Sequence, residues 1–185
     1  MKNFFFIISL LTVNNIYAQN KIDTLSYKKN WFVSSSIGIQ LSGIKSEDFV
    51  KSNYSPLIDL SLGKYFTSKL ALQFGYNGWY FNTISNPDKR HYAFLYGKVI
   101  FNINKIINDS KNYRWFFNLN LGSGYFYNYY YNRPNICGIL GLSLHYNLSE
   151  QTSLFISTAA IMGWDIYQNN EDILPGLKLG SIIRI

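Results

Sequence analysis

The chain is poor in cysteine, proline and charge, and each shortage excludes a class of protein. Its 185 residues include one cysteine, Cys137, which excludes an intramolecular disulfide and a zinc site built from several cysteines. Charged residues make up 15% of the chain and aromatic residues 18%, which excludes a disordered, collagen-like or coiled-coil protein. After residue 30 no run reaches 18 apolar residues, so there is no candidate for a membrane-spanning helix in that part.

The formal charge of +7 at neutral pH comes from 17 basic and 10 acidic residues. An excess of this kind is common in proteins that bind nucleic acids. Here the lysines and arginines are spread along the chain and form no basic stripe, which a protein needs to follow a phosphate backbone. The sequence therefore predicts no nucleic-acid partner.

The first residues have the three parts of a secretory signal peptide. Lys2 supplies a positive charge, Phe4 to Val13 form a mainly apolar run, and Ala18 precedes a plausible cleavage point. A transmembrane anchor would need about 20 apolar residues, and Asn14 ends the run too early. We predict a cleaved signal peptide over residues 1–18, a polar periplasmic segment over 19–30 and a folded domain over 31–185.

From Trp31 onward the dominant pattern is an alternation of apolar and polar residues, which places alternate side chains on opposite faces of a strand. The contrast is weakest in the fourth segment, where Lys98 and Asn102 mark the even-numbered face as the polar one. Eight strands are predicted in this way, over residues 31–42, 56–66, 70–81, 92–103, 115–126, 136–148, 152–163 and 177–185.

The connections between these segments alternate in length. Those at 67–69 and 149–151 are short, and 104–114 is intermediate. The long connections lie at 43–55, 82–91, 127–135 and 164–176. Short turns at one end and long loops at the other are typical of bacterial outer-membrane barrels. The predicted fold class is all-β, an eight-stranded antiparallel up-and-down transmembrane β-barrel.

Alternation alone does not choose between a soluble and a membrane barrel, so the chemistry of the two faces decides. The polar faces consist of Gly, Ser, Asn and Gln, whereas a face in contact with water carries many Lys and Glu. Aromatic residues gather at the strand ends, as they do in the two belts at membrane interfaces. One belt contains Trp31, Phe66, Trp115 and Tyr146, and the other contains Trp79, Tyr80, Tyr125, Tyr127, Tyr129, Tyr130, Tyr131 and Trp164. We predict that the polar faces line the interior and that the apolar faces contact lipid.

The leader, the eight alternating segments and the final strand Leu177–Ile185 resemble the small outer-membrane β-barrel domain family of the OmpA/OmpX type. The Tyr- and Asn-rich composition with Ala18–Gln19 resembles members from the Bacteroidota. The resemblance covers residues 31–185 and implies an integral protein of a Gram-negative cell envelope, held in outer-membrane lipid. Family members commonly end on an aromatic residue that the insertion machinery reads, and Ile185 departs from this pattern. The family has diverse functions, so the resemblance implies little about activity.

Four charged residues take the polar parity: Asp59, Lys98, Lys178 and Arg184. Charges inside a narrow barrel must be paired, so we predict a network of ion pairs and amides in the interior. The alternative is a path for protons or ions. An eight-stranded barrel is just wide enough to be filled by its own side chains. We therefore predict a plugged interior without steady conduction.

The sequence predicts no enzymatic activity, metal site or cofactor. The best enzymatic alternative is a lipid A deacylase, because such barrels resemble this architecture and use a His/Ser pair on the outer wall. His145 takes the inward parity, and Tyr146 and Asn147 follow it where a serine partner is expected. Gly122–Ser123–Gly124 is similar to a nucleophile elbow but lacks the strand-to-helix turn, so it is interpreted as a close-packed strand.

The tyrosine run of the fifth connection lies in a predicted external loop. Tyr129, Tyr130, Tyr131 and Arg133 are candidate contacts for an extracellular or envelope protein, because aromatic and Arg residues are enriched at interaction hot spots. Anchoring at the membrane interface explains the tyrosines equally well. The sequence thus predicts a non-enzymatic barrel with a structural or adhesive role. The alternatives are a lipid-modifying enzyme and a soluble periplasmic barrel that binds a small apolar ligand.

Overall fold

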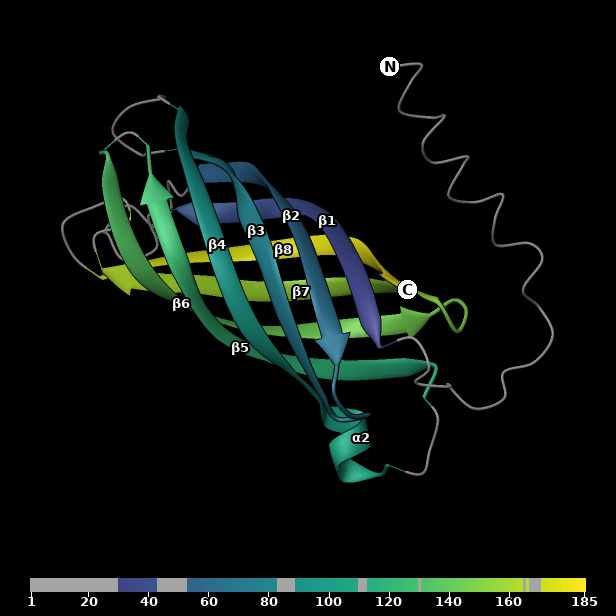
Figure 1. The fold of residues 1–185 in the computed structure, drawn as a ribbon. Coiled ribbons are helices and arrows are strands. Elements are labelled where there is room, and N and C mark those ends of the chain that lie inside the picture. The colour runs from purple at the N-terminus through teal and green to yellow at the C-terminus, as the bar shows by residue number, and fades with distance from the viewer. Residues whose placement is uncertain are drawn as a thin grey trace, which may run out of the picture.

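Eight antiparallel strands form a closed barrel in the computed structural model, with β8 paired to β1 (Figure 1). The strands are β1 (Trp31–Ser42), β2 (Asn53–Tyr65), β3 (Leu70–Asn82), β4 (Lys89–Asn102), β5 (Trp115–Asn128), β6 (Arg133–Asn147), β7 (Thr152–Trp164) and β8 (Glu171–Arg184). The predicted fold class is confirmed. The structure describes residues 30–42, 53–82, 89–109, 113–129, 131–164, 166 and 171–185. The predicted signal peptide and the segment 19–29 lie outside the described residues.

The two ends of the barrel differ, and we call them the turn end and the loop end. The turn end carries the tight turns Phe66–Lys69 and Leu148–Gln151. The last residue also lies there, because the Ile185 amide donates to the Trp31 carbonyl at 2.9 Å. At the opposite, loop end the strands continue as four paired hairpins.

Most strands extend further toward the loop end than the sequence predicted, and three of them contain a proline near that end. Pro56, Pro134 and Pro175 lie within β2, β6 and β8. Each pairs with only one neighbouring strand, because the pairing to the second neighbour starts one to four residues further along. A missing amide donor is tolerated on an edge of this kind. The hairpins therefore run past the closed part of the barrel, and His91, expected at the base of a loop, lies within β4.

The intermediate connection contains a short helix, α2 (Ile103–Ile107), which projects from the turn end in Figure 1. Asn102 caps this helix by accepting the Lys105 amide at 3.0 Å. β4 pairs with β5 only as far as Asn102, so the start of β5 has an open edge, where the Asn104 side chain accepts the Phe117 amide at 2.7 Å. No helix in the described ranges has the length and hydropathy to cross a membrane.

Side-chain exposure alternates along the strands as predicted, with the polar set inside. In β1, Ser34, Ser36 and Gln40 are buried while Val33 and Ile37 are exposed. The large apolar side chains exposed on the outer wall include Leu60, Leu62, Phe74, Leu95, Phe117, Leu121, Leu140, Leu142, Leu154, Ile156, Leu177, Leu179 and Ile183. An apolar surface of this extent is stable against lipid rather than water.

The interior contains two apolar clusters with a polar layer between them. The larger cluster lies toward the loop end and includes Tyr92, Phe94, Tyr96, Phe126, Cys137, Ile139, Ile161, Ile166 and Leu174. The smaller one lies toward the turn end and consists of Phe32, Ala71, Ile100 and Ile182, with Tyr65 and Phe155 packed against it. Trp79, predicted for one of the aromatic belts, is 48% exposed, and its backbone φ of 154° departs from a regular strand.

Candidate functional site

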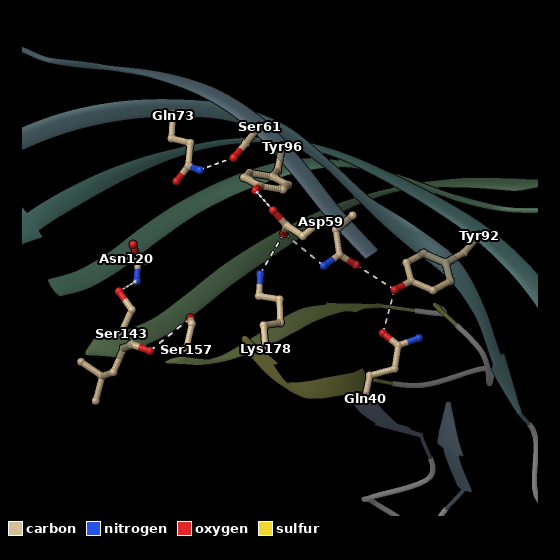
Figure 2. A network of polar contacts seen from close by, with 12 residues as sticks. Gln40, Asp59, Ser61, Gln73, Tyr92, Tyr96, Asn120, Ser143, Ser157 and Lys178 are labelled. Carbon is tan, nitrogen blue, oxygen red and sulfur yellow. Dashed lines mark hydrogen bonds and ion pairs between the residues drawn. The ribbon is translucent and has the colours of Figure 1, made fainter. Parts of the chain in front are cut away.

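The polar layer is centred on Asp59 (Figure 2). The Lys178 ammonium lies 2.8 Å from Oδ2 of this carboxylate, and both side chains are buried. The Tyr96 hydroxyl donates to Oδ1 at 2.8 Å, and the Asn77 amide donates to Oδ2 at 3.3 Å. Asp59 thus joins β2 to β3, β4 and β8, and both of its oxygens are occupied.

A branch of this network continues toward the loop end through Tyr92. The Tyr92 hydroxyl lies 2.8 Å from Oδ1 of Asn77 and 2.7 Å from Oε1 of Gln40. A phenol has one proton, so it donates to one of these oxygens at a time. The Tyr92 ring stacks on Phe126 with the centroids 5.0 Å apart, which connects the polar layer to the larger apolar cluster.

A second polar group lies nearer the turn end. The Gln73 amide donates to the Ser61 hydroxyl. On the far side of the layer, the Asn120 amide donates to Oγ of Ser143 at 3.2 Å, and Nε2 of His145 lies 2.8 Å from the same Oγ. The His145 ring lies between Phe116 and Phe155, at centroid distances of 4.9 and 5.3 Å.

A cavity of about 20 Å³ lies between these two groups. One water molecule needs about 10–15 Å³ measured in this way, so the cavity has room for one small guest. It is lined by Ser34, Asp59, Gln73, Lys98, Ile100, Asn120, Ser143, His145, Phe155, Ser157, Lys178 and Ile182. The described interior therefore contains a space of atomic size at this level.

The four charged residues predicted for the interior do not form one network. Asp59 and Lys178 are paired, and Lys98 lines the same cavity. Arg184 lies at the turn end instead, where it donates to the Glu150 carbonyl at 2.7 Å and approaches the Tyr65 ring at 5.8 Å. Its place near the end of β8 separates it from the polar layer.

The interpretation that His145 has no serine partner on its face was wrong. The partner is Ser143, which lies two residues before the histidine rather than after it, and strand alternation could have revealed it. The pair lacks other features of a catalytic site. Both side chains are buried inside the barrel, and no carboxylate among the described residues contacts the histidine. The Nδ1 atom of His145 has no hydrogen-bond partner in the described part of the chain.

The neutral side chains that complete the interior lie on the inward faces that the alternation predicts, but their partners were not predicted. Gln40, Asn77, Tyr92 and Tyr96 all take the inward parity, so the alternation contained the signal. Their partners are set by the register between neighbouring strands, which pairs Asp59 with Asn77.

The predicted external contacts lie at the loop end, on the β5–β6 hairpin. Tyr129 is 60% exposed, and Tyr131 and Arg133 are also exposed. Tyr130 lies outside the described residues. The hairpin is held by the Tyr127 hydroxyl, which donates to the Asn132 side chain.

No protein-family model matches this sequence, and no curated protein does either. Several solved structures do match. Neisserial surface protein A has a TM-score of 0.59 at 9% identity, with 84% of this chain and 97% of that chain covered. The outer membrane enzyme PagL has a TM-score of 0.50 at 13% identity, covering 83% and 99% of the two chains. Ail, the attachment invasion locus protein of Yersinia pestis, has a TM-score of 0.49 at 14% identity, covering 85% and 99%.

The chain has the fold of the small outer-membrane barrels. Because this fold occurs in a surface protein and in an enzyme, it is compatible with more than one activity. The role of this barrel must therefore be argued from its own interior and its own loop end.

Proposed function

We propose that this protein is a non-enzymatic outer-membrane barrel with a structural or adhesive role, which displays the β5–β6 hairpin outside the cell. The observation that supports this most is the filled interior. Two apolar clusters and the layer around Asp59 and Lys178 occupy it from one end to the other. A barrel packed in this way is a rigid support, and its variable chemistry lies at the loop end.

The displayed surface is aromatic and ordered. The Tyr125 and Tyr127 rings stack at 6.4 Å, and Tyr129 meets Tyr127 edge to face at 4.9 Å. Asn132 adopts a positive φ of 52°, which asparagine tolerates better than most residues, so the turn is fixed. Fixed aromatic side chains beside an arginine lose little entropy on binding a protein partner.

Attachment assays test the adhesive role. A Gram-negative laboratory strain without its own adhesins would express the wild type or a variant with Tyr129→Ser, Tyr131→Ser and Arg133→Ser. We expect the wild type to increase self-aggregation or attachment to an epithelial monolayer, and the variant to return to background. Heat-modifiable gel migration of both proteins from the outer-membrane fraction is the folding control. Recovery of the wild type in the periplasmic wash would contradict the location and favour the soluble ligand-binding barrel.

The structural role has a separate test. Deletion in the native host is expected to raise sensitivity to detergent, and the triple variant should restore resistance because its barrel is intact. Wild-type expression without any effect on attachment, together with a deletion that leaves detergent resistance unchanged, would contradict both roles.

The Ser143–His145 pair and the likeness to PagL favour a lipid-modifying enzyme as the second candidate. The buried position of the pair opposes it, because a lipid on the outer wall has no route to Ser143. Mass spectrometry of lipid A from cells that express the barrel distinguishes an enzyme from a non-enzymatic barrel. We expect the same masses with and without the barrel. A mass loss that disappears in Ser143→Ala would establish the enzyme instead.

A further inference from the structure

The polar layer holds two ammonium groups and one carboxylate. Lys178 is paired with Asp59 at 2.8 Å. Among the described residues no carboxylate oxygen lies within 4.0 Å of the Lys98 ammonium, whose one aromatic contact is the Tyr96 ring at 5.2 Å. A charged group inside a barrel needs a counter-charge or a solvating partner. With both lysines protonated, the layer has an excess of one positive charge.

Lys98 also has space beside it. It lies on β4, paired in register with Gln73 of β3 and Gly122 of β5. Lys98 and Lys178 both line the cavity of about 20 Å³. A single water-sized or slightly larger guest fits there.

Several groups around the cavity have N–H donors to spare. Asp59 is the one carboxylate in the lining, and its two oxygens are already occupied by Tyr96, Lys178 and Asn77. An ammonium has three donors and a side-chain amide two. Lys98, Lys178, Gln73 and Asn120 therefore retain N–H groups, and Ser34 adds a hydroxyl.

We propose that this cavity is a binding site for a small monovalent anion, of the size of chloride, held between Lys98 and Lys178. The anion balances the excess charge and accepts the remaining N–H donors. A water molecule would fill the space but leave the charge uncompensated.

Halide-dependent stability tests the site. The barrel is refolded into detergent micelles in sodium chloride, sodium bromide or sodium gluconate at equal ionic strength, and its urea midpoint is measured. A ligand that binds only the folded state raises that midpoint with its concentration. We expect the wild type to be more stable in either halide than in gluconate, which is too large for the cavity. Crystals grown in bromide should show an anomalous peak among Lys98, Asn120 and Lys178.

Lys98→Met removes the unpaired charge and should abolish both the halide dependence and the bromide peak. Lys64→Met is the matched control, because Lys64 lies over the Trp31 ring near the turn end and away from the cavity lining, and it should retain both effects. If Lys98→Met does not fold, Lys98→Gln serves in its place. Equal wild-type midpoints in all three salts, an empty cavity in bromide crystals, or a peak that persists without the lysine would each overturn the proposal.

Discussion

Asp59 determines the stability of the polar layer because it accepts from three neighbours at once. Asp59→Asn leaves Lys178 buried without its counter-charge, and breaking a buried pair in this way costs about 3–5 kcal/mol. The double variant Asp59→Asn/Lys178→Met should recover much of that loss, since the Lys178 charge is removed together with its partner. Urea unfolding of the refolded barrel measures the free energy of unfolding of both variants. A double variant as unstable as the single one would show that the ion pair is not the cause.

Leu60 and Ser61 are neighbours on β2 that face opposite sides, with exposed fractions of 53% and 8%. Leu60→Arg directs a cation at lipid near mid-strand and should cost about 2–4 kcal/mol in a bilayer. Ser61→Arg tests the interior, where crowding is the main penalty. Single cysteines at the two positions, in a Cys137→Ser background, should react with a water-soluble thiol reagent more slowly at 60 than at 61. The reverse order would contradict the assignment of the two faces.

The inward position of single residues could be predicted from the sequence, because burial follows the two-residue period of a strand. Their partners could not. Asp59 and Lys178 are 119 residues apart and meet only because β8 closes onto β1. Arg184 has the same parity as Lys178 but lies at the turn end of β8, where its partner is the Glu150 carbonyl.

Glycines on β5 allow β4 and β5 to approach closely. A Cβ on Gly122 would lie 2.2 Å from the Gly97 carbonyl oxygen, so Gly122→Ala must push the two strands apart. We expect a loss of about 1–3 kcal/mol, as for overpacking in a core. Gly138→Ala on β6 is the control, because its nearest neighbour would be 3.9 Å away. Equal urea midpoints for the two variants would count against close packing as the role of Gly122.

Asp109 connects the α2 segment to the β2–β3 turn outside the barrel. Ser68 donates to its carboxylate at 2.7 Å and Lys69 lies 3.3 Å away, and these two contacts lower the pKa of Asp109 below its ordinary value of 3.8. Because the folded-state pKa is depressed, the contribution to stability is present above pH 3.8 and is lost as the pH falls through the lower value.

An NMR titration of the Asp109 side-chain carboxyl carbon measures this shift. We expect a midpoint below 3.8 in the wild type and a midpoint closer to 3.8 in Ser68→Ala. A wild-type midpoint at or above the ordinary value would contradict the tether between the two turns.

The strand ends show which features of an element a sequence can predict. Alternation located β1 over its full length, since it has no proline and stays paired on both sides. The predicted last strand began too late, at Leu177, because Pro175 interrupts the alternation. In the structure β8 already pairs with β7 from Glu171 onward. Helix α2 gave no signal, because five residues are too few for a helical stripe.

At the scale of the whole molecule, the aromatic belts agree with a barrel that crosses a bilayer. At the turn end Trp31, Phe66 and Trp115 are exposed, and Tyr125 and Tyr129 are exposed toward the loop end. Cations accompany the turn-end belt, where the Lys64 ammonium lies 5.1 Å from the Trp31 ring and Arg114 lies 5.0 Å from the Tyr146 ring. The topology could be predicted because lengths of connections, unlike partners of side chains, are directly visible in a sequence.

The filled interior predicts that the barrel does not conduct. The polar layer lies between two apolar clusters that include Phe94 and Phe126 on one side and Phe32 on the other, and it contains a cavity of about 20 Å³. Planar-bilayer recordings of the purified, folded protein should show no steady open channel. Asp59→Ala should lower the urea midpoint without creating one, because the aromatic clusters remain. A reproducible porin-like conductance in the wild type, absent from mock preparations, would contradict the plugged interior and favour transport over a structural or adhesive role.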